Sequence, residues 1–315
     1  MDGTLVYETE TRYTYIPVPD IAAGTYYIGI KACDEIEEIC GDWSVQEVTI
    51  VGDEPAPSGF LAAYPGAAGA YSLRDLTGDG GAVVRAYRVA DTTEQDFTAA
   101  EITDGTLATF ANGGDVRVET LYDQSGNGRD LPRTYGNALI VASGAVNLSN
   151  GKPFIAFPSL KATFHATESG PLLEDLTLLC VHQSAWTTER RCFGLSGISG
   201  TGVARDSFAF SDDHSLRFDG AFTPGSLLAS TGNKIRIATK NSDVVTDHIN
   251  SVQNINTSVT GLVTEGKISL GDANTTYSLT TGFEGKIFEA IIWYSDLSVD
   301  RAQMTADINN YYEFY

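Results

Sequence analysis

The side chains of this 315-residue chain that could do chemistry are few and widely spread. None of its histidines has the H-E-x-x-H spacing of a zinc hydrolase; they are His165, His182, His214 and His248. Gly194-Leu195-Ser196-Gly197 lacks the G-x-S-x-G pattern of a nucleophile elbow. Gly78-Asp79-Gly80-Gly81 lacks the Lys-Ser/Thr of a phosphate loop and is typical of a turn. We therefore expect the histidines to be surface or packing residues.

Carbohydrate recognition is the chemistry that the remaining candidates suit, since sugar sites combine an aromatic face with a few polar groups. Trp186 lies in a turn between two predicted strands, and Tyr277 lies close in sequence to Asp272. Each aromatic has an alternative role: Trp186 could cap a sheet edge, and Tyr277 could face solvent from a strand. Asp212-Asp213 could bind an ion or solvate a turn.

The four cysteines are too few for a disulfide scaffold. Cys33 and Cys40 flank an acidic turn between two predicted strands, and facing positions near such a turn can form a disulfide. Cys180 and Cys192 lie about symmetrically around a turn, so they either face one another or are two separate buried thiols. No C-x-x-C pair supports a zinc site, and the metal content is left unknown.

The chain carries a formal net charge of −21, with a sequence pI of about 4.4. Such a field repels phosphate backbones and anionic membranes, so no nucleic-acid partner is expected. Acidic loops could hold calcium, but no ordered Asp-x-Asp-x-Asp-Gly loop occurs, so no cofactor is predicted. No apolar run approaches the roughly twenty residues that span a bilayer. The start, Met1 to Thr4, has neither the basic head nor the apolar stretch of a secretory signal.

Residues 60–315 read as many short strands with little helix between them, which predicts an all-β, antiparallel, concanavalin-like jelly-roll sandwich. The predicted strands are 82–89, 116–122, 154–157, 176–182, 192–195, 207–210, 216–219, 234–239, 243–249, 267–271 and 285–294. A short helical turn is expected at 107–111. The chain ends in a predicted helix, Val299 to Tyr312, with Ser298 as its N-cap. Trp43 and Trp293 are expected in cores.

The segment before this sandwich is shorter. Gly24-Thr25-Tyr26-Tyr27, followed by Asp42-Trp43-Ser44, resembles the last strands of a fibronectin type III domain. The resemblance implies a partial, Ig-like β unit at 1–52. Residues 53–59 contain Pro55 and Pro57 and are predicted to be a semi-stiff linker.

The most distinctive string is Tyr122-Asp123-Gln124-Ser125-Gly126-Asn127-Gly128-Arg129-Asp130-Leu131. Its residues suit a strand that ends in a tight turn, because Gly adopts positive φ and Asp, Ser and Asn bond to nearby backbone. The string resembles the Tyr-Asp-Gln-Ser-Gly segment in the catalytic sandwich of family 54 α-L-arabinofuranosidases. Its layout also resembles concanavalin-like (LamG-like) domains of tailed-bacteriophage virion proteins.

The resemblance to arabinofuranosidases implies a carboxyl acid/base after a late strand and a Glu nucleophile followed by Asn-Gly. Asp272, followed two residues later by Asn274, matches the first place. Phe218 takes the place of the Glu, and a one-residue shift to Asp219 would turn that side chain to the opposite face. Where those enzymes carry adjacent, bonded cysteines, this chain has Cys192 alone.

These observations predict a non-enzymatic structural protein on the surface of a bacteriophage virion, acting in head decoration, a fibre or tail adhesion. Its expected partners are other virion proteins in an oligomer, and host or environmental glycans. The expected glycan-binding residues are Asp272, Asn274, Asp219, Trp186 and Tyr277. The alternatives are an arabinofuranosidase-like glycoside hydrolase and a secreted, extracellular carbohydrate-binding lectin.

Overall fold

The computed structural model describes residues 59–158, 162–169, 173–184, 191–198, 204–211, 216–218, 221–223, 232–258, 266–271 and 282–315, and four strands near the N-terminus. The chain divides into two compact units, Met1–Pro57 and Ser58–Tyr315. Among the described residues, no helix is long and apolar enough to cross a membrane.

The first unit contains two antiparallel strand pairs. β1 (Gly24–Ile30) pairs with β4 (Ser44–Ile50), and β2 (Cys33–Asp34) pairs with β3 (Ile39–Cys40). Cys33 and Cys40 are direct register partners. Cα atoms of facing residues in such a pair lie about 4.5–5.5 Å apart, within the range that a disulfide requires. The disulfide and the fibronectin-like character of this unit stay predictions.

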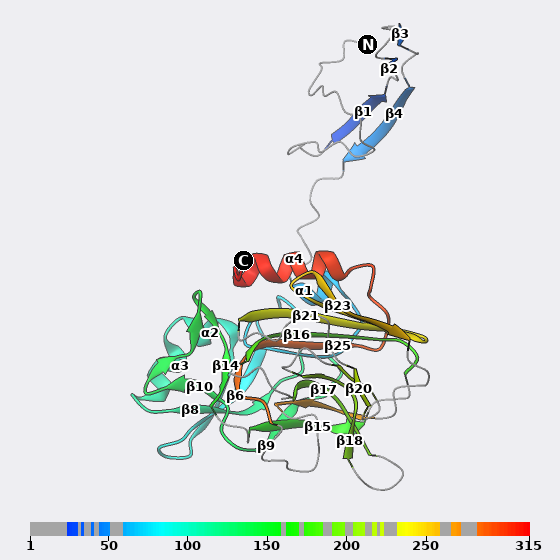
Figure 1. The fold of residues 1–315 in the computed structure, drawn as a ribbon. Coiled ribbons are helices and arrows are strands. Elements are labelled where there is room, and N and C mark those ends of the chain that lie inside the picture. The colour runs from blue at the N-terminus through cyan, green and yellow to red at the C-terminus, as the bar shows by residue number, and fades with distance from the viewer. Residues whose placement is uncertain are drawn as a thin grey trace. The chain divides into compact units, whose positions relative to one another are not determined.

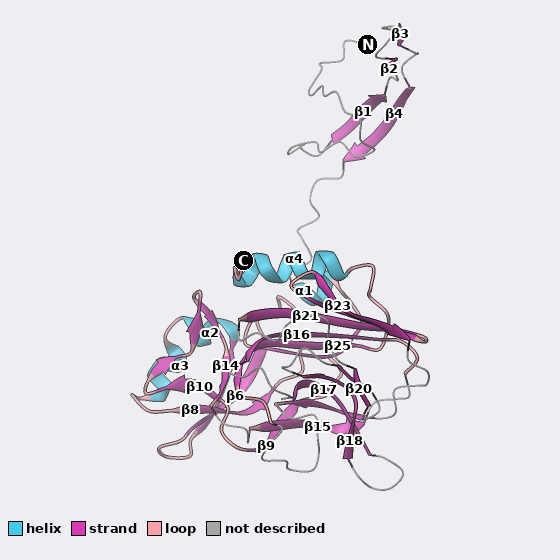
Figure 2. Cartoon of the chain, in the orientation of Figure 1, coloured by secondary structure: helices cyan, strands magenta, loops and turns pink. Residues whose placement is uncertain are grey.

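The second unit is a sandwich of two antiparallel sheets (Figures 1 and 2). The first sheet contains β5 (Ala67–Ser72), β6 (Ala82–Arg88), β7 (Glu94–Thr98), β8 (Val116–Leu121), β10 (Leu139–Ala142), β11 (Ala145–Val146), β14 (Ile155–Phe157), β16 (Leu176–Ser184), β21 (Asn233–Asn241), β22 (Val244–Ile249), β23 (Val252–Ser258) and β25 (Gly285–Trp293). The second contains β15 (Thr163–Ser169), β17 (Arg191–Ile198), β18 (Ala204–Ser211), β19 (Leu216–Phe218), β20 (Ala221–Thr223) and β24 (Gly266–Leu270).

Strand β9 (Leu131–Tyr135) joins the two sheets, because its first residues pair with β8 and its last with β15. A separate small pair consists of β12 (Leu148–Ser149) and β13 (Lys152–Pro153). The helices are α1 (Phe60–Ala63), α2 (Ala99–Thr103), α3 (Thr106–Ala111) and α4 (Arg301–Tyr312). The predicted all-β antiparallel sandwich with a C-terminal helix is thus confirmed.

Strand β16 shows why both sheet faces are apolar. Its start is an almost unbroken apolar run, and alternate side chains of a strand point to opposite faces. Leu178 and Cys180 join the core between the sheets. Leu179 and Val181 join a second cluster with Ile308 of α4, which covers the outer face of β16, β21 and β25 (Figure 1). The sheet is therefore buried on both faces here.

The C-terminal helix begins later than the sequence indicates. It starts at Arg301 with Asp300 at the N-cap position, and no side chain caps it. Ser298, the expected cap, instead donates its hydroxyl to Asp296, at 3.0 Å. The Ser298 hydroxyl is therefore already hydrogen-bonded in this turn before the helix begins. The prediction that Ser298 is the N-cap was wrong.

Candidate functional site

A polar cluster lies inside the sandwich, at the inner face of β21, β22 and β23. Arg236 donates from Nη2 to Asp247 at 2.7 Å and from Nε at 3.0 Å, and Asn254 donates to the same carboxylate at 2.7 Å. The Arg236 and Asp247 side chains are completely buried. The guanidinium lies 4.5 Å from the ring centre of Phe210, which belongs to the facing sheet. Buried charges must be paired, and this cluster satisfies that rule.

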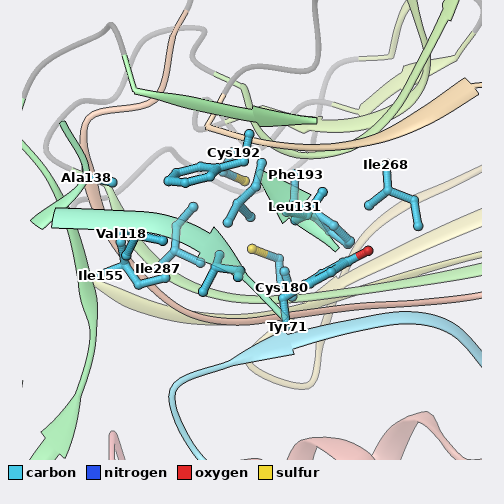
Figure 3. Packing of buried hydrophobic residues seen from close by; sticks show 14 of the residues in the cluster. Tyr71, Val118, Leu131, Ala138, Ile155, Cys180, Cys192, Phe193, Ile268 and Ile287 are labelled. Carbon is cyan, nitrogen blue, oxygen red and sulfur yellow. The ribbon is translucent and has the colours of Figure 1, made fainter. Parts of the chain in front are cut away.

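A cluster of sulfur and imidazole lies beside it. Cys180 is the cross-strand partner of Arg236, and His182 is the partner of Lys234. Cys192 comes from β17 in the facing sheet, and its sulfur points toward that of Cys180 (Figure 3). The two cysteines are buried thiols, as the sequence favoured, and they also face one another (Figure 3). The Cys192 thiol donates to the carbonyl of Phe210 at 3.8 Å.

Next to this cluster, the ends of strands β17, β24 and β25 bring together the residues that border segments 185–190 and 272–281. The Gly271 amide donates to the Cys192 carbonyl at 2.8 Å, and the Phe283 amide donates to the Gly271 carbonyl at 2.6 Å. Segment 272–281 therefore leaves and re-enters the described fold at one point. Arg191 forms an isolated bridge with Gly282, so segment 185–190 ends beside the same point. The Phe283 ring also contacts the His182 ring, with centroids 6.1 Å apart.

The residues that the sequence assigned to glycan binding lie outside the described residues; they are Asp272, Asn274, Asp219, Trp186 and Tyr277. Their assignment to glycan binding stays a prediction. Among the described residues, Arg191 lies beside Gly282, and Gly271 lies beside Phe283. Asp212 and Asp213 also lie outside the described residues.

Asp219 follows a strand that ends elsewhere. Phe218 and Ile268 are in one register row, three strands apart. Strands are about 4.8 Å apart and rise about 3.3 Å per residue, so Phe218 lies roughly 17 Å from Gly271. A retaining glycosidase needs carboxylates about 5 Å apart. The strand before Asp219 therefore ends far from the strand before Asp272.

The Tyr122–Leu131 turn is a clasp, meaning that its side chains hydrogen-bond to the backbone of β5 and of the turn that follows β5. The Asp123 carboxylate accepts the backbone amides of Ala70, Ser125 and Arg129, at 2.9–3.0 Å. The Gln124 side chain donates to the carbonyls of Ser72 and Arg74 and accepts the Leu76 amide. These hydrogen bonds hold β5 and the turn after it in place. The role of the Tyr122–Leu131 motif in the described structure is therefore to stabilise the fold. A shallow hollow of about 280 Å³ beside it is lined by residues that include Gln124 and Ser125.

Two of the histidines have perturbed environments. Burial, followed by the nearby Lys267 charge, lowers the pKa of His165 to about 4. Its Nδ1 lies 2.7 Å from the Ser269 hydroxyl. Burial also lowers the pKa of His248, with Arg301 contributing and Asp247 opposing. Both are packing residues, as expected. His182 is completely buried beside the thiols, and His214 lies outside the described residues.

Sequence reasoning missed the Arg236–Asp247–Asn254 cluster. A signal was present: Lys234 and Arg236 alternate with Ile235 and Ile237 within one strand. Charged residues at alternate positions of a buried strand share one face, and that face must hold their partners.

No protein-family model and no curated protein matches the sequence. A solved structure of a family 54 α-L-arabinofuranosidase, a point mutant soaked with 4-nitrophenyl α-L-arabinofuranoside, is similar over 80% of this chain, with a TM-score of 0.50 and 15% identity. An arabinofuranosidase complexed with arabinofuranosyl-α-1,2-xylobiose matches over 79%, with a TM-score of 0.49 and 16% identity. A Trypanosoma rangeli sialidase matches over 59% of this chain and 30% of its own, with a TM-score of 0.40 and 11% identity.

This likeness establishes a β-sandwich fold of the kind found in these glycosidases. The chain spans 64% of the length of the arabinofuranosidase structures. The expectation that the protein is not an enzyme was wrong as an inference from this fold, because a solved structure that shares the fold over 80% of this chain is a glycoside hydrolase. That expectation rested on Phe218 in the place of a nucleophile, which excludes one residue and not the reaction class.

Proposed function

We propose that the Ser58–Tyr315 unit is a carbohydrate-active β-sandwich that binds a glycan where segments 185–190 and 272–281 are anchored. The observation that carries the proposal is the pair of contacts at this point, between Arg191 and Gly282 and between Phe283 and Gly271. They bring the segment that contains Trp186 next to the segment that contains Asp272. The fold likeness to an α-L-arabinofuranosidase supports the same class of ligand.

The proposed division of labour follows from the chemistry of these residues. Trp186 and Tyr277 offer aromatic faces on which the C–H face of a sugar ring packs. Asp272 and Asn274 accept and donate hydrogen bonds to sugar hydroxyls. The buried Arg236–Asp247 pair is fully satisfied inside the sandwich and stabilises the sheets that carry these segments.

Calorimetric titration of the full chain with arabinofuranosyl-substituted xylo-oligosaccharides tests binding. Trp186→Ala and Asp272→Asn are each expected to weaken binding at least tenfold. Tyr315→Ala is the matched control, since this exposed aromatic follows α4, and it should leave the affinity unchanged. Equal affinities in all four proteins would contradict the proposed site.

Hydrolysis is the second candidate function, favoured by the position of Asp272 directly after Gly271 at the end of β24. Asp272 would protonate the leaving oxygen, and a second carboxylate would attack the anomeric carbon or activate water. Release of 4-nitrophenol from 4-nitrophenyl α-L-arabinofuranoside measures the activity. Asp272→Asn should abolish hydrolysis, whereas a weakened glycan affinity through Trp186 should persist. Activity unchanged in Asp272→Asn would exclude that residue as the acid.

The setting that we propose for this unit is the surface of a bacteriophage particle, where it assembles with other virion proteins as an oligomer. The support is the resemblance of the Tyr122–Leu131 layout to virion sandwich domains and the net charge of −21. Mass spectrometry of gradient-purified particles tests it. Recovery of the protein in the medium, separate from any particle, would favour the secreted lectin or hydrolase instead.

A further inference from the structure

Three metal-ligating side chains converge in the core between the two sheets. The Cys180 sulfur, a His182 ring nitrogen and the Cys192 sulfur all lie within 4.8 Å of one another, and all three residues are fully buried. Cys180 and His182 are two residues apart on β16, so strand geometry directs both to one face. Cys192 approaches from β17 of the facing sheet (Figure 3). The three donors therefore come from both layers of the sandwich.

The donor set selects the metal. Thiolate and imidazole suit zinc, whereas calcium and magnesium require oxygen ligands. Zinc–sulfur bonds of about 2.3 Å in a tetrahedral site place two sulfurs about 3.8 Å apart. The donors here are already within 4.8 Å, so side-chain movement of about an ångström would complete the geometry. Two cysteines and one histidine leave a fourth position, which zinc proteins fill with water or a substrate.

The charges also balance. Two thiolates and a neutral imidazole around Zn²⁺ have a net charge of zero, which an apolar core tolerates far better than an isolated ion. The charged neighbours on β21 are Arg236, opposite Cys180 and already paired with Asp247, and Lys234, opposite His182.

We propose that Cys180, His182 and Cys192 bind one zinc ion that ties the two sheets of the sandwich together. Because the donors are completely buried, the ion enters as the chain folds and leaves when it unfolds. Zinc binding releases two protons, one from each thiol; in the metal-free protein the Cys192 thiol donates its proton to the Phe210 carbonyl. This site adjoins the anchor of the proposed glycan site, because the Cys192 carbonyl accepts the Gly271 amide, but its test has a separate readout.

The test begins with the full chain unfolded in chelator and refolded with or without zinc. Elemental analysis is expected to give one zinc per chain after refolding with zinc. Zinc at about 100 times its Kd should raise the Tm by roughly 5–10 °C for a domain of this size. Refolding with cobalt should produce thiolate-to-cobalt charge-transfer absorption, which a site made of histidine or carboxylate alone cannot give.

The variants Cys180→Ala and Cys192→Ala should each lose the zinc and the cobalt absorption. Cys33→Ala, in the first unit, is the control and should keep both. A refolded wild-type chain without zinc and without the cobalt absorption would overturn the proposal, as would a Cys180–Cys192 disulfide found in chains refolded with zinc. If a variant fails to fold, the wild-type cobalt spectrum and metal content decide.

Discussion

Arg236 and Asp247 form a bidentate ion pair in the interior of the sandwich, with contacts of 2.7 and 3.0 Å, and neither side chain is exposed to solvent. A third residue, Asn254, completes the hydrogen bonds of the carboxylate. Breaking a buried pair leaves an unpaired charge in a medium of low dielectric constant.

We therefore expect Asp247→Asn to lower the free energy of unfolding by about 3–5 kcal/mol. Urea denaturation followed by tryptophan fluorescence measures it. Arg85→Gln, which breaks the exposed pair with Asp96, is the control and should cost far less, because water screens an exposed ion pair. Similar losses of unfolding free energy in both variants would show that the buried ion pair stabilises the protein no more than the exposed one.

Asp123 holds three backbone amides in the clasp that fixes β5. Hydrogen bonds to a charged acceptor each contribute about 1.5–3 kcal/mol, although such contributions do not add fully. Asp123→Ala should therefore reduce the free energy of unfolding by about 2–4 kcal/mol. Asp79→Ala, in an exposed turn, should change it by less than about 0.5 kcal/mol. A stable Asp123→Ala protein would mean that the clasp does not support the sheet.

Gly271 is a position where only glycine fits. Its φ is +86°, and an added Cβ would lie 2.3 Å from the Ala162 carbonyl oxygen. Gly66 has nearly the same φ, +80°, with nothing within 4 Å of the added atom. Gly66→Ala should cost about 1–2 kcal/mol from backbone strain alone. Gly271→Ala should cost more than that, because the backbone must also shift.

The same substitution tests the glycan site. Since Gly271 is bonded to Cys192 and Phe283, a shift there displaces both ends of segment 272–281. Glycan affinity should fall in Gly271→Ala and persist in Gly66→Ala. Calorimetry on both variants under conditions where they are fully folded makes the comparison. Unchanged affinity in Gly271→Ala would place the site elsewhere.

His165 makes stability depend on pH. Burial and Lys267 lower its pKa to about 4 in the folded protein, below the ordinary value of 6.5. The unfolded chain therefore binds more protons in this range, so the histidine's contribution to stability is complete above pH 6.5 and is lost as the pH falls toward 4. Urea midpoints measured from about pH 7.5 to about pH 4 should fall less steeply in His165→Asn than in the wild-type chain. Parallel profiles would show that carboxylates alone govern the acid sensitivity.

Strands were predicted best from the sequence where a buried strand consists of a long run of apolar residues. β16 and β25 are long apolar runs, and both were predicted to within two residues at each end. β5 and β23 were missed for opposite reasons: Ala67–Ser72 is rich in small residues, and Val252–Ser258 is mostly polar. Their strand form comes from pairing with β25 and β22, which is a property of neighbours that no local pattern records.

By itself, the sequence determined the sandwich, the strands with an apolar face and the turn at Tyr122–Leu131, because local patterns and turn residues specify these. The tertiary structure alone decided that Cys180 and Cys192 face one another from opposite sheets and that Arg236 finds Asp247 two positions off its direct partner. It also decided that Arg191 meets Gly282 and that Gly271 meets Cys192 and Phe283. The physical reason is that sheet pairing and layer packing join residues far apart in the chain, and no local preference records which ones will meet.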